Sequence, residues 1–252
     1  MLDLLENRHS VRSFTVEPLS QSVIDRLKSE ATYINSHEAG LNFQLVFNDS
    51  TPFAGFRQSY GIFRNVRNYL AVVIDPTFPD TYERAGYFAQ QFVVEALKLN
   101  LGTCYVGATF SKNHIQPRME VYEKLPFVIA LGFPDVDKTS LIGNLTSRLA
   151  HFKKRKPVDF FDGSEDEYNR AKSLFPWIDD ALRAVACAPS SLNRQPVRLA
   201  LKSVDGSDCI VAYTVDGNKS AVDLGIAKFN VASVVQGIWD FGQYAPFYPD
   251  TD

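Results

Sequence analysis

The same order of apolar patterns occurs twice along this chain, and this repetition constrains the fold more than any other feature. The first stretch begins with a helix that Ser20 caps, followed by alternating apolar residues over 43–47. A continuous apolar strand at 69–74 and a long amphipathic helix at 81–99 come next, and a second buried strand at 127–133 closes the stretch. The pattern predicts helix, strand, strand, long helix, strand.

The second stretch repeats this order in outline. A helix at 178–187 leads to a strand at 197–202 and another at 209–214. A long apolar helix is predicted over 221–241, with Ser220 and Asp223 forming a capping box at its start. Both long helices contain a glycine among small and β-branched residues. We interpret the repetition as an internal duplication.

Helices interspersed with short strands predict an α+β fold built on a mixed or antiparallel sheet. One half would occupy residues 1–150 and the other residues 161–252, joined by a basic connector at 148–160. The 252 residues would then form one pseudo-duplicated domain. Its two pseudo-symmetric halves, each a sheet flanked by helices, would meet through their long central helices.

The composition argues against several classes of protein. With 26 basic and 29 acidic residues the net charge is −3, so a dedicated nucleic-acid binder is not expected. No apolar run is long enough to span a bilayer, and the first residues do not form a signal peptide. Three scattered cysteines, each among apolar neighbours, fit buried thiols in the cytoplasm. The histidines and cysteines are not spaced as metal ligands, so no metal is expected.

A short polar turn occupies residues 188–196. Pro189 ends the preceding helix, and Pro196 favours an extended conformation for Gln195 before the next strand. Two serines, an asparagine, an arginine and a glutamine lie between the prolines. Taken alone, such a cluster is usually a polar surface loop.

A second polar segment near the start of the chain changes that interpretation: Arg8-His9-Ser10-Val11-Arg12-Ser13-Phe14. Together the two segments resemble the nitroreductase family of flavoproteins. In that family an Arg-x-Ser-x-(Lys/Arg) segment binds the phosphate, ribityl chain and pyrimidine edge of FMN. A Pro-Ser-Ser-x-Asn-x-Gln-Pro turn approaches the same flavin from the other subunit. Ordinary members have the two motifs a few tens of residues apart, whereas most of the chain separates them here.

The resemblance implies a role for each residue of the first segment. Arg8, with His9 and Ser10, would bind the FMN phosphate through a planar guanidinium and a hydroxyl. Arg12 matches the family position whose cation faces the flavin N1–O2 edge, where it would stabilise negative charge.

Three further segments have counterparts in the family. Lys153 and Arg155 resemble the basic pair that follows its last strand, although a solvated linker or a nucleic-acid patch fits this basic stretch as well. Gly107 and Ala108 belong to a segment resembling the one whose backbone N–H groups point at flavin N5. The turn would cover the isoalloxazine ring with Pro189, Ser190, Ser191, Asn193 and Gln195.

Each predicted half keeps only one of the two motifs. The first half has no Pro-Ser-Ser sequence at 31–36. In the second half Pro157 and Asp159 stand where Ser10 and Arg12 would be expected, and a carboxylate there would repel a phosphate. We therefore expect one FMN site per chain in a monomeric fused pseudo-dimer. A homodimer in which two chains exchange parts fits the sequence equally well.

The resemblance implies an FMN-dependent oxidoreductase in which NADH or NADPH reduces the flavin and a small, flat, electron-poor acceptor, such as a nitroaromatic or a quinone, then reoxidises it. No side-chain acid or base is required, so the residues named are binding and tuning residues. The alternative is a flavin-binding or flavin-sequestering protein with little or no turnover. The sequence does not distinguish NADH from NADPH or identify the physiological acceptor.

Overall fold

The computed structural model describes residues 1–53, 62–107, 115, 117–135 and 155–250. The chain divides into two compact units that interleave in sequence. The first, called here the N-terminal unit, contains His9–Thr81 and Gln91–His151. The second, the C-terminal unit, contains Met1–Arg8, Tyr82–Gln90 and Phe152–Asp252. Two pieces of the predicted first half, residues 1–8 and 82–90, thus group with the second.

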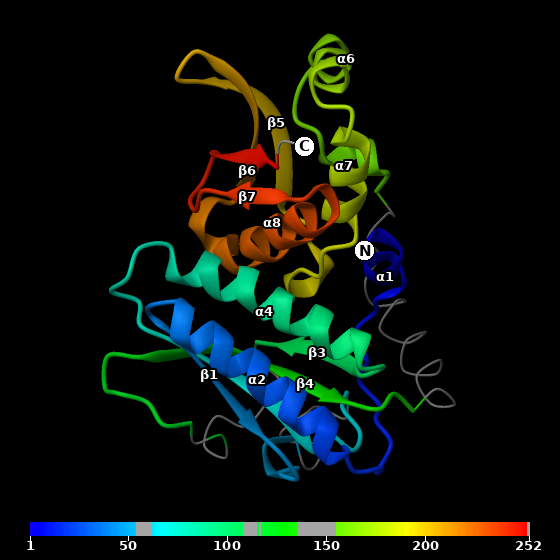
Figure 1. Cartoon of the computed structure of the whole chain (residues 1–252), viewed down its shortest axis with the longest axis vertical. Helices are drawn as coiled ribbons and strands as arrows, with labels where there is room; N and C mark the ends of the chain where they lie inside the picture. The colour runs from blue at the N-terminus through cyan, green and yellow to red at the C-terminus, as the bar shows by residue number, and fades with distance from the viewer. Residues whose placement is uncertain (54–61, 108–114, 116, 136–154, 251–252) are drawn as a thin grey trace. The chain divides into compact units, whose positions relative to one another are not determined.

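The N-terminal unit is built on a four-stranded antiparallel sheet in the order β1-β2-β4-β3 (Figure 1). Strand β2 is buried along its whole length, and the last six residues of β4 are buried as well. Both strands read as continuous apolar runs because both of their faces are covered. The bounds are Leu41–Val46 for β1, Asn68–Ile74 for β2, Gly102–Val106 for β3 and Lys124–Gly132 for β4.

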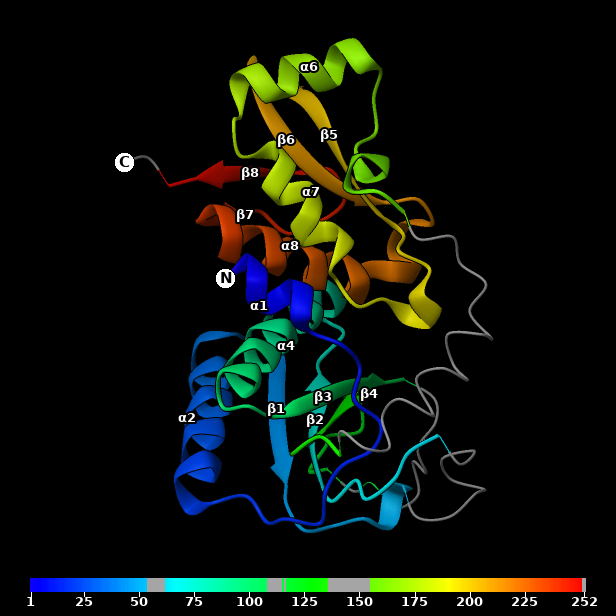
Figure 2. The ribbon, with the colours of Figure 1, turned by 90° about the vertical axis from the view of Figure 1, so that its right-hand side faces the viewer.

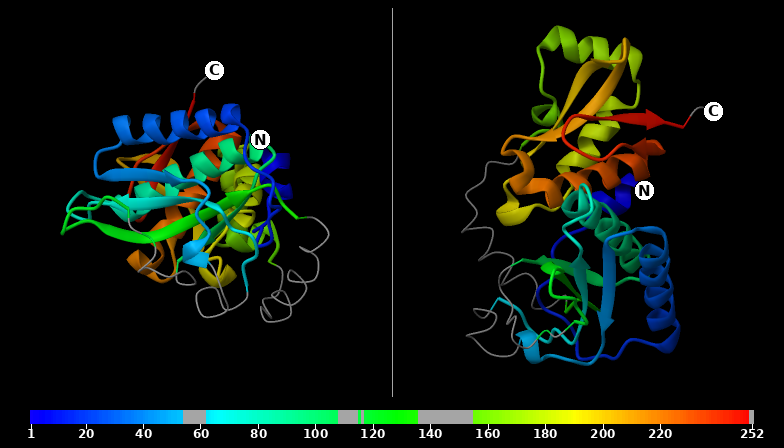
Figure 3. Two further views of the ribbon diagram at one scale, coloured as in Figure 1. Left: turned by 90° about the horizontal axis from the view of Figure 1, so that it is seen from below. Right: turned by 90° about the vertical axis from the view of Figure 1, so that its left-hand side faces the viewer.

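Helix α2 (Gln21–His37) packs against β1 and lies along this sheet (Figure 3). The backbone nitrogen of Val23 donates to the Ser20 hydroxyl over 3.4 Å, so the predicted cap is present. Leu27, Ala31 and Ile34 are buried on one face of the helix, and the opposite face is polar.

The C-terminal unit has a second four-stranded antiparallel sheet, in the order β5-β6-β8-β7. Helix α7 packs against α8, and the two helices lie next to each other in Figure 2. The short α1 packs on α7, where Arg183 forms a 2.9 Å ion pair with Glu6. The helices are α1 (Leu2–Asn7), α6 (Glu165–Leu174), α7 (Ile178–Ala186) and α8 (Ala221–Val235). The strands are β5 (Val197–Val204), β6 (Ser207–Thr214), β7 (Gly237–Trp239) and β8 (Ala245–Pro249). Its single 3-10 turns are η3 (Pro157–Phe160), η4 (Ser191–Asn193) and η5 (Gly217–Ser220), whereas η1 (Thr51–Phe53) belongs to the N-terminal unit.

The two sheets share one topology. In each sheet the first two strands of the chain are neighbours, and the fourth strand lies between the second and the third. Every pairing is antiparallel. A long helix follows the second strand in both cases, α4 (Thr81–Lys98) in one and α8 in the other. The predicted α+β class, with antiparallel sheets flanked by helices, is confirmed.

Residues 82–90 of α4 cross α8 within the C-terminal unit, and a glycine on each helix makes the crossing possible. A Cβ placed on Gly86 would lie well inside 3.0 Å of the Val222 carbonyl oxygen. A Cβ on Gly225 would lie closer still to the Glu83 carbonyl oxygen. The contact is reciprocal, because each glycine meets the residue three positions before the other glycine. Such reciprocity is the signature of a two-fold contact between similar helices.

A buried ion pair lies beside this crossing. Lys228 Nζ is 2.5 Å from Glu83 Oε1, and the two side chains are 0% and 3% exposed. Lys228 also donates to the carbonyl oxygens of Asp240 and Gly242, over 2.9 and 2.8 Å. Glu83 Oε2 accepts from the Gly242 backbone nitrogen over 2.9 Å. The pair is therefore hydrogen-bonded on both sides, which offsets the cost of removing two charges from water.

The prediction that α8 continues to Phe241 is wrong. The helix ends at Val235, since Gln236 has φ 62, and β7 follows. Ile238 is 66% exposed and Trp239 is 7% exposed, the alternation of a strand. Their apolar side chains continued the helical pattern in the sequence but belong to the sheet.

The crossing can be tested by substituting Gly86→Ala. The new methyl group would collide with the backbone of α8, which cannot move as a flexible side chain can. We expect a loss of roughly 3 kcal/mol in the free energy of unfolding, measured by urea denaturation. Gly107→Ala is the matched control, because a Cβ there meets no atom within 4 Å. Equal stability of the two variants would contradict the crossing.

Candidate functional site

The predicted turn, residues 188–196, joins α7 to β5 and is called here the Pro-Ser-Ser turn. Helix α7 positions it by burying Ile178, Ala181, Leu182, Ala184 and Val185. Leu192, Asn193 and Gln195 have φ values of 53°, 55° and 51°. Gln195 is therefore left-handed and not extended as predicted. Left-handed backbone costs a non-glycine residue roughly 1 kcal/mol, so the surrounding structure must hold this turn in place.

Hydrogen bonds within the turn supply part of that restraint. The Ser190 hydroxyl accepts from the Gln195 backbone nitrogen over 2.9 Å, and the Gln195 amide donates to the Ala186 carbonyl oxygen over 3.2 Å. The Asn193 backbone nitrogen donates to the Ser190 carbonyl oxygen over 3.0 Å. Two residues predicted to contact flavin, Ser190 and Gln195, therefore also shape the turn.

Asp223, near the start of α8, is hydrogen-bonded to the Pro-Ser-Ser turn. Its carboxylate accepts from the Ser191 backbone nitrogen over 3.2 and 3.4 Å, and the residue is only 6% exposed. The predicted capping box between Ser220 and Asp223 is wrong, since the Ser220 hydroxyl donates to Asp216 instead, over 2.9 Å. Burial raises the pKa of Asp223 from 3.8 to about 6, against the opposing effects of the Ser191 N–H and of Arg194.

Two arginines meet at the end of the turn. Arg155 Nη1 donates to the Gln195 carbonyl oxygen over 3.1 Å, and Arg198 Nη1 donates to the same oxygen over 3.0 Å. The structure thus brings the predicted Arg155 to the Pro-Ser-Ser turn. Arg198 was not predicted. It is the second residue of β5, and an arginine between the apolar residues Val197 and Leu199 was the available signal.

The N-terminal motif is divided between the two units. Arg8 is the C-cap of α1 in the C-terminal unit, and His9 begins the N-terminal unit. Ser10 forms a parallel bridge with Thr103 of β3, and the Val11 backbone nitrogen donates to the Thr103 carbonyl oxygen over 2.9 Å. A Cβ on Gly102 would lie 2.6 Å from Val11 Cγ2, so this glycine lets the motif lie against β3.

The motif alternates between buried and accessible side chains. Val11 and Ser13 are buried, whereas Ser10 and Arg12 are half-buried. The Arg12 carbonyl oxygen accepts from the Arg64 backbone nitrogen over 2.9 Å. The Arg12 guanidinium has no hydrogen bond or ion pair among the described residues. It is a half-buried cation that the described part of the chain does not neutralise.

The predicted residues fall in both units. Arg8, Arg155 and the Pro-Ser-Ser turn belong to the C-terminal unit, and His9, Ser10, Arg12 and Gly107 to the N-terminal unit. Gly107 follows the end of β3 and is exposed. Ala108 and Lys153 lie outside the described residues.

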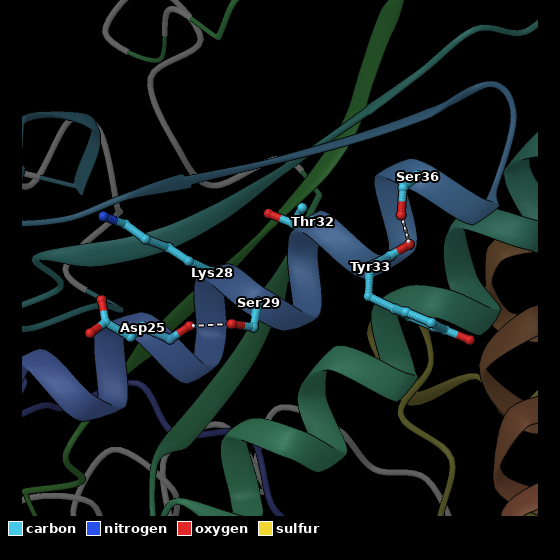
Figure 4. A pocket seen from close by; sticks show the side chains of 6 residues that line it. All are labelled: Asp25, Lys28, Ser29, Thr32, Tyr33 and Ser36. Atoms are coloured by element: carbon cyan, nitrogen blue, oxygen red, sulfur yellow. Dashed lines mark hydrogen bonds between the residues drawn. The ribbon is translucent and has the colours of Figure 1, made fainter.

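A shallow hollow on α2 is a separate feature (Figure 4). The Ser29 hydroxyl donates to the Asp25 carbonyl oxygen and the Ser36 hydroxyl to that of Tyr33, both over 2.9 Å. All the lining residues stand on this one helix, and none was predicted to bind a ligand. They are Asp25, Lys28, Ser29, Thr32, Tyr33 and Ser36. A single helix face does not enclose a ligand, so no function is assigned to it.

The family described as "Putative TM nitroreductase" matches residues 1–234. This chain belongs to that family. The resemblance seen in its two motifs is thereby confirmed across nearly the whole sequence. No curated protein sequence matches the chain.

Three solved structures are similar to the chain over different lengths. A "putative nitroreductase" from Thermotoga maritima is 19% identical, with 98% of this chain and 91% of that chain covered and a TM-score of 0.59. An FMN-dependent nitroreductase from Clostridium difficile is 18% identical, covering 54% of this chain and 88% of its own, with a TM-score of 0.43. A nitroreductase family protein from Clostridium novyi is 14% identical, with 54% and 86% covered and a TM-score of 0.43. The first of these comparisons establishes that a chain of this length has the nitroreductase-like fold.

None of the helices in the described part of the chain has the length and apolarity needed to cross a membrane. No group of three or more His, Cys, Asp or Glu side chains among the described residues is placed to hold a metal ion.

The pKa of Asp223 leads to a prediction for stability. Between pH 3.8 and about 6 the folded state binds more protons than the unfolded state, so the contribution of Asp223 to stability falls as the pH rises through this window. Asp223→Asn keeps an acceptor for Ser191 but does not titrate. The free energy of unfolding of the wild type, relative to this variant, should fall by up to about 1.4 kcal/mol per pH unit.

Tryptophan fluorescence is the appropriate measurement, because both tryptophans, Trp177 and Trp239, belong to the C-terminal unit. Urea unfolding would be measured at about pH 4.5, 5.5, 6.5 and 7.5, which covers the titration of Asp223. Parallel pH profiles for the wild type and Asp223→Asn would contradict the assignment.

Proposed function

We propose that this protein is a cytoplasmic FMN-dependent oxidoreductase that takes electrons from NADH or NADPH and passes them to a flat, electron-poor acceptor such as a nitroaromatic or a quinone. Membership of the nitroreductase family supports the class of reaction. The two FMN motifs of the sequence, Arg8–Arg12 and the Pro-Ser-Ser turn, support the cofactor. All three cysteines are free thiols, which fits a reducing compartment.

The conformation of the Pro-Ser-Ser turn is the observation that carries the proposal. An ordinary surface loop has no need of three left-handed, non-glycine residues held by a buried carboxylate. Strained backbone that its surroundings over-determine is concentrated at binding sites. In the proposed site, Ser190, Ser191 and Asn193 would present hydroxyl and amide groups to the flavin from this fixed turn.

The cations of the proposed site fit the charge of FMN. Arg8, Ser10, Arg155 and Lys153 would bind the phosphate, for which guanidinium groups provide paired N–H donors. Arg12 would face the N1–O2 edge of the flavin. Its guanidinium has no counter-ion among the described residues, as expected of a cation that a ligand is to neutralise.

FMN, when bound, supplies the redox chemistry by accepting a hydride at N5 and returning it to an acceptor. The residues of this chain would bind and orient the cofactor and tune its affinity for electrons. Arg12 would favour negative charge at the flavin edge, which makes reduction easier. No side-chain acid or base is needed for this reaction.

We also propose that the chain is an internal duplication with one FMN site. The shared strand order of the two sheets and the reciprocal contact of Gly86 and Gly225 support duplication. The structural role of Asp159 supports a single site. Its carboxylate accepts from the Lys156 backbone nitrogen over 2.8 Å and closes the η3 turn, with Pro157 at its start. Pro157 and Asp159 thus form a turn at the positions where the second half would need a phosphate-binding motif.

The proposed activity is tested by anaerobic titration of the flavin-loaded full chain with NADH or NADPH. Loss of the visible flavin absorbance, and its return when a quinone or nitroaromatic is added, is the expected result. A flavin that binds but is not reduced by either nucleotide would favour the alternative, a flavin-binding protein without turnover.

Two arginine substitutions separate binding from tuning. Arg12→Ala should retain some FMN but be reduced more slowly, by about tenfold or more, because one charge at the flavin edge is lost. Arg8→Ala should purify without flavin. Stopped-flow absorbance and the flavin content of the purified variants provide the two measurements. A full complement of flavin in Arg8→Ala would show that the phosphate assignment is wrong.

A further inference from the structure

Arg155 and Arg198 form a pair of like charges around one carbonyl oxygen. Each donates from Nη1 to the oxygen of Gln195, so their nitrogens are separated by no more than two hydrogen-bond lengths. Arg198 Nη1 also donates to the Val197 carbonyl oxygen over 2.7 Å. These bonds fix one nitrogen of each guanidinium and leave their other N–H donors for a further acceptor.

The carboxylates around this pair have other partners. Asp162 accepts from the Tyr213 hydroxyl over 2.5 Å, and Asp159 accepts from the Lys156 backbone nitrogen over 2.8 Å. Among the described residues neither Arg155 nor Arg198 has an ion pair within 4.0 Å. Arg170 and Arg194 in the same unit do form such pairs, with Asp208 at 2.5 Å and Asp216 at 3.6 Å.

Arg198 is also held away from water. It is half-buried, and its guanidinium carbon lies 5.5 Å from the centre of the Phe160 ring. Burial, and next the charge of Arg155, lowers the pKa of Arg198. Arg155 beside it is exposed, so only one of the two cations is partly shielded from water. The two cations repel each other, and an anion between them would be attracted to both.

We propose that Arg155 and Arg198 together bind a phosphate monoester, with Arg198 as a ligand that neither FMN motif contains. Two guanidinium forks match the oxygens of a phosphate, and one carbonyl fixes both to the end of the Pro-Ser-Ser turn. The phosphate monoester is that of FMN or the 2′-phosphate of NADPH. The FMN case rests on the function proposed above, whereas the NADPH case concerns the choice of electron donor.

The experiment compares Arg198→Met and Arg155→Met with the wild type in the full chain. Arg170→Met is the matched control, since it removes a guanidinium that pairs with Asp208 on the surface of the same unit. Three measurements are made on each: dissociation constants for FMN and for riboflavin, the NADPH to NADH ratio of kcat/KM, and the shift of the melting temperature by inorganic phosphate.

If the FMN phosphate occupies the site, Arg198→Met weakens FMN binding by about 10- to 100-fold and leaves riboflavin binding within about twofold. If the 2′-phosphate of NADPH occupies it, FMN binding is unchanged and the preference for NADPH over NADH falls by about tenfold. In both cases inorganic phosphate stabilises the wild type and Arg170→Met, and it stabilises the Arg198 and Arg155 variants less.

The proposal would be overturned if Arg198→Met kept the melting-temperature shift by phosphate, the affinity for FMN and the NADPH to NADH ratio of the wild type. The two arginines would then only support the turn. A wild type that binds no flavin would refute the proposed function, but the phosphate measurement would still test the pair. If Arg198→Met does not fold, Arg198→Lys replaces it. Arg198→Lys keeps the positive charge but loses the paired N–H donors of the guanidinium. We expect it to lose part of the preference for FMN over riboflavin.

Discussion

The crossing of α4 and α8 in the C-terminal unit is the constraint on which the rest of that unit depends. Gly86 and Gly225 allow the two backbones to touch, and the buried pair Glu83–Lys228 fixes the segment that returns from β7 toward β8. Both contacts join residues that lie far apart in the sequence, 145 positions for Glu83 and Lys228. Removing one member of a buried ion pair leaves an uncompensated charge and typically costs about 3–5 kcal/mol, so the arrangement tolerates little variation.

The candidate site is linked to this crossing through α8. Gln90 of α4 donates to Asn230 of α8 over 2.9 Å, and Asn230 donates to the Ala184 carbonyl oxygen of α7 over 3.1 Å. Helix α7 leads directly into the Pro-Ser-Ser turn, and Asp223 of α8 holds that turn from its other side. The strained turn is therefore supported by both helices that pack beneath it, as a preorganised binding segment requires.

Much of this architecture could be predicted from the sequence, because its signals are local. Continuous apolar runs identified β2 and β4, and the Ser20 cap identified α2. The end of α8 was placed too late because Ile238 and Trp239 fit a helical period as well as an alternating strand. Asp223 and Arg198 were missed for another reason. Their roles arise from the Ser191 and Gln195 backbone, contacts made only after folding, and near Ser220 a local capping box was the simpler interpretation of Asp223.

We propose that this chain is an internal duplication with one FMN site, because each predicted half keeps only one of the two motifs. The most direct test is the flavin-to-chain ratio of the full chain after saturation with FMN, desalting and denaturing release. We expect one FMN per chain. Two per chain would mean that Asp159 and residues 31–36 still serve a second site, and would contradict the single-site duplication.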